Sequence, residues 1–150
     1  MRQRFNFSGA KIALLCEDKI LTTLRDNFPE IPYPNHWDLP GGGREGDETP
    51  FECLVREVYE ELGLMVTENQ IFAVKTYPCM IDPTKKSVFM VGTMTPTDFE
   101  NIIFGDEGQD YQLMPIDDWL NRTDVIPRLQ ERLREWEEQK SESDEIVDEL

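Results

Sequence analysis

One short segment of the sequence carries three acidic residues at spacings that a helix does not favour. Glu57, Glu60 and Glu61 are three and four residues apart, so a helix places them on a single face. Like charges at these spacings repel each other, and helix stability therefore does not explain the cluster. A divalent cation does, because Mg²⁺ prefers carboxylate oxygens and commonly bridges to substrate phosphates. The cluster therefore indicates a metal-binding face.

The ends of this helix are marked by residues that cap helices. Thr49 and Pro50 fit the N-cap and the first helical position, and Glu52 completes a capping box with Thr49. Gly63 lies where a left-handed C-cap is expected. The apolar residues between these ends recur with a helical period and predict a buried stripe: Phe51, Leu54, Val55, Val58 and Leu62. We therefore predict a helix between Thr49 and Gly63.

The residues around the acidic cluster fit a metal or phosphate site. Arg56 is next to Glu57 and one turn before Glu60, so it can neutralise and orient a carboxylate. The preceding segment 39–43 is expected to be only a loop, in which glycines let backbone carbonyls approach an ion or a phosphate closely.

This segment resembles the Nudix box, the signature of the Nudix hydrolases, and most closely its MutT-type members. The box consists of a glycine, a glutamate, an Arg-Glu pair, a Glu-Glu pair and a final glycine at fixed spacing, with two aliphatic positions. Every specified position is filled: Gly42, Glu48, Arg56, Glu57, Val58, Glu60, Glu61, Gly63 and Leu64. A solvated acidic helix face is the alternative interpretation, which would account for an isolated pair of glutamates better than for the complete pattern.

The resemblance implies a catalytic centre that holds Mg²⁺, with Mn²⁺ as a possible substitute. It implies these metal ligands, of which the glycines act through a backbone carbonyl: Gly41 or Gly42, Glu57, Glu60, Glu61 and Glu107. It implies these catalytic residues: Arg56, Glu57, Glu60 and Glu107. In this scheme Arg56 orients Glu57, Glu48 makes a supporting bond, and either Glu57 or a later loop glutamate takes the proton from the attacking water.

Two of the implied residues lie outside the box. MutT-type enzymes carry a further metal-binding glutamate in a Glu-Gly-Gln-like loop before a strand, and Glu107 begins such a sequence ahead of a predicted strand at 111–116. A solvated loop is the alternative, and three nearby acids compete for the role: Glu100, Asp106 and Asp110. Arg25 ends a predicted strand where similar proteins contact substrate phosphates, although a surface arginine is the alternative.

The resemblance implies hydrolysis of a diphosphate linkage in a nucleoside diphosphate joined to another group. We expect a nucleoside triphosphate or another small nucleotide as the substrate. An oxidised purine nucleotide and an ADP-ribose-type molecule are alternatives. Enzymes for oxidised purines have a base-reading asparagine, whose nearest equivalents here are Asn121 and Arg122, and the register favours Arg122. A non-catalytic module that binds or senses nucleotides is the alternative function, but such modules usually lose box glutamates and this chain retains all of them.

The composition excludes several other classes of protein. The chain of 150 residues is long enough for one domain with a full core, which we expect in residues 1–140. Its net charge of −16 argues against binding long nucleic acid, and no apolar run is long enough to span a membrane. Acidic residues are concentrated at the end of the chain, where we expect residues 141–150 to form a disordered acidic tail.

The cysteines and the histidine also limit the chemistry. Cys16, Cys53 and Cys79 are odd in number and widely spaced, as expected for free thiols in a reducing cytoplasm. His36 is the only histidine, which excludes a multi-histidine metal site. We therefore expect a cytoplasmic protein, either a monomer or a homodimer, whose partner is a small nucleotide.

The remaining sequence predicts an α/β fold. Strands are expected at 11–16, 20–24, 37–39, 70–80, 87–95 and 111–116, and a closing helix at 123–138. Prolines make 27–35 a loop, and 82–86 is expected to be the turn of a hairpin. This order fits an α/β/α sandwich on a mixed β-sheet, which is also the fold that the Nudix resemblance implies.

Overall fold

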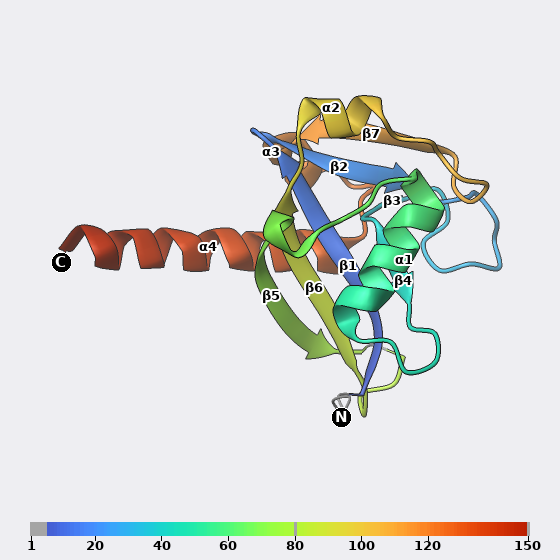
Figure 1. Ribbon diagram of the computed structural model, residues 1–150, viewed down its shortest axis with the longest axis horizontal. Helices are drawn as coiled ribbons and strands as arrows, with labels where there is room; N and C mark the ends of the chain where they lie inside the picture. The colour runs from blue at the N-terminus through green and yellow to red at the C-terminus, as the bar shows by residue number, and fades with distance from the viewer. Residues whose placement is uncertain (1–5, 80, 150) are drawn as a thin grey trace.

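Within the described part of the chain, seven strands form one sheet with helices on both faces (Figure 1). The structure is a computed structural model that describes the backbone of residues 6–79 and 81–149, and the side chains of these ranges up to residue 140. The strands are β1 (Phe7–Cys16), β2 (Lys19–Leu24), β3 (Trp37–Asp38), β4 (Gly41–Gly43), β5 (Ile71–Pro78), β6 (Lys86–Thr93) and β7 (Asp110–Pro115). The helices are α1 (Pro50–Leu62), α2 (Pro96–Glu100), α3 (Ile116–Asn121) and α4 (Pro127–Glu149), with a 3₁₀ turn η1 at Glu68–Gln70.

The sheet is mixed, as predicted. Its strand order is β3-β2-β1-β6-β5, with β4 also paired to β1 and β7 to β2. The central strands β1 and β6 run parallel, from Phe7 beside Lys86 to Leu15 beside Thr93. The other pairs are antiparallel, including the predicted hairpin of β5 and β6. Parallel neighbours in the centre require a long connection, and α1 lies within the one that joins β1 to β6.

A separate core lies on each face of the sheet. Alternate residues of β1 point to opposite faces, so Ile12 enters one core and Ala13 the other. Helix α1 buries Leu54 in the first core, while α3 and α4 bury Trp119 and Leu133 in the second. This arrangement confirms the predicted α/β/α sandwich.

Helix α1 begins and ends where its capping residues predict. Thr49 Oγ1 accepts a hydrogen bond of 3.2 Å from the backbone N–H of Glu52, and Glu52 Oε1 accepts one of 2.9 Å from the backbone N–H of Thr49. Gly63 has a φ of 66° and closes the helix in the left-handed conformation. These local contacts fix the position of the acidic face relative to the sheet.

The prediction that segment 39–43 is only a loop is wrong. Gly41–Gly43 form β4, which pairs antiparallel with Gly9–Lys11 of β1. Gly41 has a φ of 129°, and a Cβ on this residue would collide with the backbone carbonyl of Ala10. Only glycine permits this close approach, and a run of glycines carries no side-chain pattern that predicts strand pairing.

The sequence also missed or misplaced several helical segments. It predicted neither α2 nor α3, and α4 begins at Pro127, later than the expected start at 123. The helical backbone of α4 continues to Glu149, through the segment expected to be a tail. Side chains after Lys140 lie outside the described residues, and the disorder of 141–150 stays a prediction. In the described part of the chain, no helix is both long and apolar enough to cross a membrane.

Candidate active site

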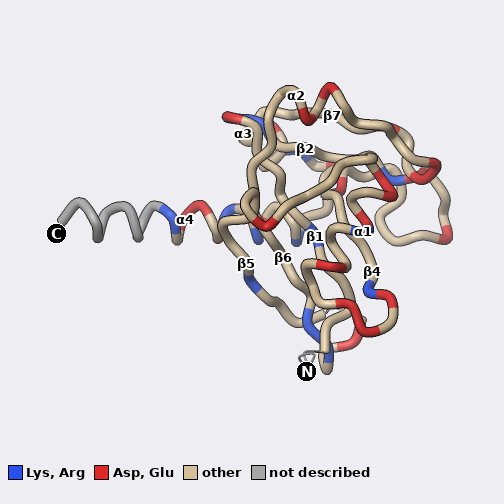
Figure 2. The backbone as a smooth tube through the Cα atoms, viewed as in Figure 1, with Lys and Arg blue, Asp and Glu red and all other residues tan. Residues whose placement is uncertain are grey.

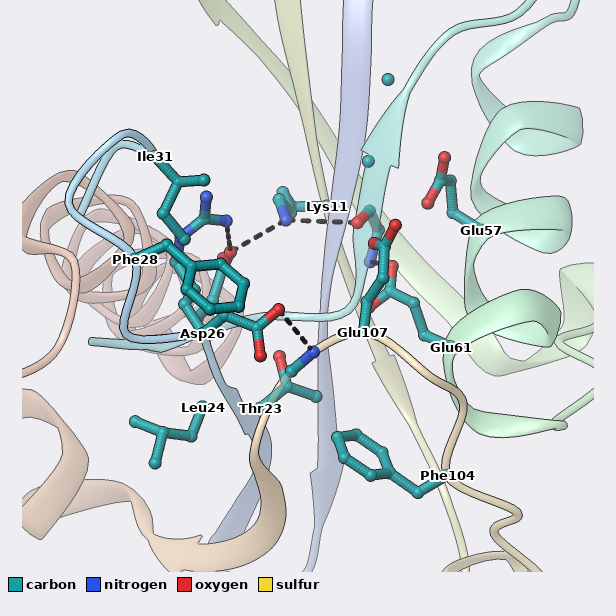
Figure 3. Close-up of a pocket in the computed structure, with 16 residues that line it drawn as sticks. Lys11, Thr23, Leu24, Asp26, Phe28, Ile31, Glu57, Glu61, Phe104 and Glu107 are labelled. Carbon is teal, nitrogen blue, oxygen red and sulfur yellow. Dashed lines mark hydrogen bonds and ion pairs between the residues drawn. The ribbon is translucent and has the colours of Figure 1, made fainter. Parts of the chain in front are cut away.

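A cavity of about 600 Å³ lies between α1, β4, the end of β2 and the loops that follow β2 and precede β7 (Figure 3). Its volume falls in the range of small-molecule binding sites. Most of the residues implicated by the sequence line it: Arg25, Gly41, Gly42, Glu57, Glu61 and Glu107. Arg56 and Glu60 are not among the residues that line the cavity.

Arg56 holds the carboxylates of the box together. It donates from Nε to Glu48 Oε2 at 2.7 Å and from Nη2 to Glu48 Oε1 at 3.0 Å. Its Nη1 donates to Glu57 Oε1 at 2.9 Å, and its Nη2 to the carbonyl oxygen of Gly43 at 2.7 Å. The hydrogen bond from Arg56 holds the pKa of the Glu48 carboxyl below its usual value. The contacts expected of Arg56 and Glu48 are therefore present, while the catalytic roles stay predictions.

Glu60 points out of the site. Its side chain is 56% exposed and accepts a hydrogen bond of 3.3 Å from Arg56 Nη1. The structure therefore brings Glu57 and Glu61 into the cavity but leaves Glu60 beside them on the helix surface.

Glu61 is the glutamate of the box whose pKa is shifted most by its surroundings. It accepts a hydrogen bond of 3.1 Å from the backbone N–H of Gly41. Burial raises the pKa of Glu61 to about 8, and the attraction of Lys11 and the bond from Gly41 offset only part of this rise. The raised pKa favours the protonated form of Glu61 when no metal is bound, and a cation that binds Glu61 would displace the proton.

Glu57 lies against the glycines of β4. A Cβ on Gly42 would come within 2.5 Å of Glu57 Oε2, so the missing side chain provides the space that the carboxylate fills. The box glycine is therefore required by its contact with the box glutamate. This contact also places the Glu57 carboxylate beside the backbone of β4.

Glu107 enters the cavity from the loop before β7, on the same side as Glu57 and Glu61 (Figure 3). The loop is anchored by its neighbours, since the N–H of Gly108 donates to Asp26 Oδ2 at 3.2 Å. Gln109 Nε2 donates to the backbone oxygen of Arg25 at 2.7 Å. The Glu-Gly-Gln sequence thus fixes the loop to the end of β2. The competing acids do not line the cavity: Glu100, Asp106 and Asp110.

Three charged residues form the opposite wall, and the sequence interpretation missed two of them. Asp38 is buried, and its Oδ2 accepts hydrogen bonds from Lys11 Nζ at 3.2 Å and from Arg25 Nη1 at 3.0 Å. Lys11 Nζ also donates to the carbonyl oxygen of Gly41 at 3.2 Å. One carboxylate thus holds two cations at the cavity. The available signal was a lysine inside an apolar strand and an aspartate directly after Trp37.

Apolar side chains line the mouth of the cavity. Phe28 is 54% exposed and lies with Ile31 on one side, while Phe104 lies on the other (Figure 3). Phe104 also packs on the ring of Tyr111, with the ring centroids 5.2 Å apart. A flat apolar group can therefore enter beside the charged walls.

The other candidates from the sequence have ordinary local contacts. His36 Nδ1 lies 2.8 Å from the backbone oxygen of Pro34 within the loop. Arg122 makes two hydrogen bonds of 2.8 Å to Asp124, and neither residue lines the cavity. Cys16, Cys53 and Cys79 are free thiols, of which the first two are buried.

The donors in the cavity suit a hard divalent cation. Among the described residues, no three Asp, Glu, His or Cys side chains form a preassembled metal cluster. Mg²⁺ does not require one, because it commonly binds one or two carboxylates together with water and substrate phosphates. Glu57, Glu61 and Glu107 supply such carboxylates, and Gly41 and Gly42 supply nearby carbonyl oxygens. The residues present therefore fit Mg²⁺ or Mn²⁺.

An α/β/α sandwich whose capped helix presents the complete box to a cavity is the arrangement of a Nudix domain. The family model described as NUDIX domain matches residues 7–138. The chain therefore belongs to the Nudix family, which confirms the prediction from the box.

Curated relatives match part of the chain. Diphosphoinositol polyphosphate phosphohydrolase 2 of Mus musculus is 41% identical over 61 residues, which cover 35% of this chain and 34% of the relative. Diphosphoinositol polyphosphate phosphohydrolase 3-alpha of Homo sapiens is 38% identical over 63 residues, which cover 42% and 37%. The chain thus matches about a third of the length of these relatives.

Solved structures match nearly the whole fold. The MutT protein from Methanosarcina mazei Go1 has a TM-score of 0.70 at 18% identity, covering 92% of this chain and 98% of that one. An Ap4A hydrolase of C. elegans has a TM-score of 0.67 at 17% identity, covering 89% and 98%. At these identities the similarity shows that the fold is shared.

Proposed function

We propose that the protein hydrolyses a diphosphate linkage in a nucleoside diphosphate joined to another group, with Mg²⁺ as its cofactor. The observation that carries this proposal is a single cavity with carboxylates on one wall and two cations on the other. Glu57 and Glu61 line the first wall, and Lys11 and Arg25 line the second. The names of the relatives, phosphohydrolases and an Ap4A hydrolase, support the same class of reaction.

The carboxylate wall would hold the cation. Glu57, Glu61 and Glu107 would ligate it together with a carbonyl oxygen of Gly41 or Gly42. When bound, Mg²⁺ neutralises phosphate oxygens and lowers the pKa of the attacking water. Arg56 keeps the Glu57 carboxylate in place through its hydrogen bond of 2.9 Å.

The cationic wall would bind the phosphates. Asp38 holds both Lys11 and Arg25, so neither side chain has to be ordered when the substrate arrives. Arg25 uses Nε for Pro32 and Nη1 for Asp38 in the described contacts, which leaves Nη2 for a phosphate oxygen. Charge-assisted bonds of this kind fix the diphosphate next to the carboxylates.

Two glutamates are candidates for the base that takes the proton from the attacking water. Glu57 Oε1 is engaged by Arg56, while its Oε2 faces Gly42. Glu107 makes no hydrogen bond with the described residues, so both of its oxygens are available. A base must lie within hydrogen-bond reach of the water, and substitution of each residue distinguishes the two.

The nucleoside would lie at the apolar mouth of the cavity. Phe28 and Phe104 line it, and aromatic rings stack on the faces of nucleobases. A nucleoside triphosphate or another small nucleotide fits this arrangement. An oxidised purine nucleotide and an ADP-ribose-type molecule remain the alternative substrates, and a cytoplasmic location and a monomeric or dimeric state remain predictions.

Phosphate and pyrophosphate release from a panel of nucleotides tests this proposal. The protein is first stripped of metal and then assayed with and without Mg²⁺, and Glu61→Gln serves as the matched inactive variant. Release that depends on both Mg²⁺ and Glu61 supports the proposal. Nucleotide binding without turnover would instead establish a non-catalytic binding module.

A further inference from the structure

A second cavity, of about 380 Å³, adjoins the first across β4. It lies between the first residues of β1, the connection of β5 to β6 and the first turns of α4. Lys11, Gly42 and Gly43 line both cavities. The two cavities are therefore separated by a shared wall that includes part of β4.

The second cavity is basic in a strongly acidic protein. Four cationic residues line it: Lys11, Lys85, Arg128 and Arg132. Asp82 is the one carboxylate among its lining residues, and it accepts hydrogen bonds from Thr84. The chain as a whole has a net charge of −16, and Figure 2 shows acidic residues along α1 and the loops near it. The second cavity therefore carries a local excess of positive charge in a chain whose net charge is strongly negative.

Arg132 is the most buried of these cationic residues. It is 7% exposed, and it donates to Ser87 Oγ at 3.2 Å and lies over the ring of Tyr77, 4.5 Å from the centroid. Among the described residues it pairs with no carboxylate. Burying a guanidinium without a counter-charge is costly, so an anion in the cavity would relieve the cost.

The groups that face Arg132 do not neutralise it. Burial and the nearby Arg128 lower the pKa of Arg132, while Tyr77, Cys79 and Glu131 offset only part of this effect. Glu135, one turn further along α4, pairs instead with Lys75 and accepts a hydrogen bond of 3.3 Å from Tyr77. The positive charge of Arg132 therefore remains available to a ligand.

We propose that the second cavity binds an anionic group on the part of the substrate that is joined to the nucleoside diphosphate. This proposal rests on the proposed function. The scissile diphosphate lies at β4, the nucleoside lies at the mouth of the first cavity, and a phosphate or carboxylate of the attached group reaches Arg132 and Arg128. The protein would thus prefer substrates that are negatively charged at both the centre and the far end.

Binding of inorganic tripolyphosphate to the metal-free protein tests the anion site without requiring catalysis. Isothermal titration calorimetry compares the full-length protein with Arg132→Met and with Arg134→Met, which removes the same charge from an exposed position of the same helix. We expect Arg132→Met to weaken binding at least about tenfold and Arg134→Met to leave it unchanged. Lys85→Met, in the same cavity, provides a second variant with an unburied side chain, and it should also weaken binding.

Inhibition kinetics connect the site to the substrate. At fixed free Mg²⁺, tripolyphosphate should compete with the best nucleotide of the panel, and Arg132→Met should raise its inhibition constant at least about tenfold. Equal binding to the Arg132 and Arg134 variants, or no binding at millimolar concentration, would overturn the proposal. Arg132-dependent binding that does not compete with the nucleotide would also overturn it, by showing a site for free anions. A panel without any turnover would refute the proposed function instead, while the calorimetry would still decide whether the anion site exists.

Discussion

Arg56 and Glu48 form a bidentate pair, with hydrogen bonds of 2.7 Å and 3.0 Å. Each side chain is about one-fifth exposed, and Glu48 also accepts a hydrogen bond of 2.8 Å from the backbone N–H of Glu45. Two bonds fix the plane of the guanidinium, and its Nη1 is thereby directed toward Glu57. Glu48 is therefore a positioning residue that acts on the cavity through Arg56.

Replacing Glu48 with glutamine should lower both stability and activity. The amide loses one charge-assisted bond to Arg56, and we expect the free energy of unfolding to fall by about 1–3 kcal/mol in denaturant titrations. Glu45→Gln is the control, because the Glu45 carboxylate is 71% exposed and lies 3.5 Å from Arg56 Nε, where an ion pair contributes little. Equal effects of the two substitutions would show that the bidentate geometry is unimportant.

Removal of divalent metal should abolish hydrolysis. Glu57 lines the cavity, and without a cation its carboxylate would repel the phosphates of the substrate. We expect activity to disappear in excess chelator and to return with Mg²⁺ or Mn²⁺, as measured by phosphate release. Full turnover by metal-stripped protein in chelator would disprove the proposed mechanism.

Glu61→Gln and Glu60→Gln should each lower kcat by orders of magnitude while the fold survives. Burial raises the pKa of Glu61 to about 8, so an uncharged amide resembles the protonated carboxyl of the metal-free protein and should not destabilise the fold. Glu60 is exposed, and among the described residues its carboxylate pairs only with Arg56. The structure therefore supports a large loss of kcat less strongly for Glu60→Gln than for Glu61→Gln. Circular dichroism and thermal unfolding would accompany the kinetics. Variants that unfold, yet remain active when folded, would assign the cluster a structural role.

The stability of the metal-free protein should fall as the pH rises toward 8. Burial raises the pKa of Glu61 to about 8, whereas the ordinary value is 4.5. Between these values the folded protein binds one more proton than the unfolded chain, so the free energy of unfolding decreases with increasing pH. Deprotonation also favours metal binding, so the affinity for Mg²⁺ should rise over the same range.

Thermal unfolding between about pH 5.5 and pH 8.5 measures this dependence. The Glu61→Gln variant has no carboxyl proton to lose at this position. Its melting temperature should therefore decrease less with rising pH than that of the unmodified protein. An identical pH dependence in both proteins would contradict the raised pKa of Glu61.

Glu107→Gln should lower kcat by at least about 100-fold and change KM less, because a metal ligand or general base acts mainly in the transition state. Glu100→Gln is the control, because this substitution removes the same charge from the same stretch of the chain. Glu100 is exposed at the end of α2. Small and equal effects of both substitutions would reduce Glu107 to a solvated loop residue.

The sequence predicted best those features that depend on neighbours along the chain. Both ends of α1 were correct because Thr49, Glu52 and Gly63 form their capping contacts within one turn. The same chemistry was present and overlooked at α2, where Thr95 and Asp98 form a capping box. The N-terminus of α2 is therefore also marked by residues that are neighbours along the chain.

Features that depend on distant pairing could not be predicted in this way. Gly41–Gly43 became a strand only because β1 lies beside it, and glycines have no periodicity to reveal that pairing. Lys11 and Asp38 each looked like an isolated charge in an apolar stretch, and only the pairing of β2 with β3 and of β1 with β4 brings them to one wall. The second cavity is formed by four separate segments and left no signal in the sequence.

The pairing of β4 with β1 means that the box is not an independent folding unit. Its glycines pair as a strand with Gly9–Lys11, and β1 in turn lies beside β6. These contacts connect residues far apart in the chain, and such contacts form late and cooperatively. A peptide that contains only the box would have its helix signals but no partner strand for its glycines, and a graft of the box onto another helix would transfer the motif without its geometry.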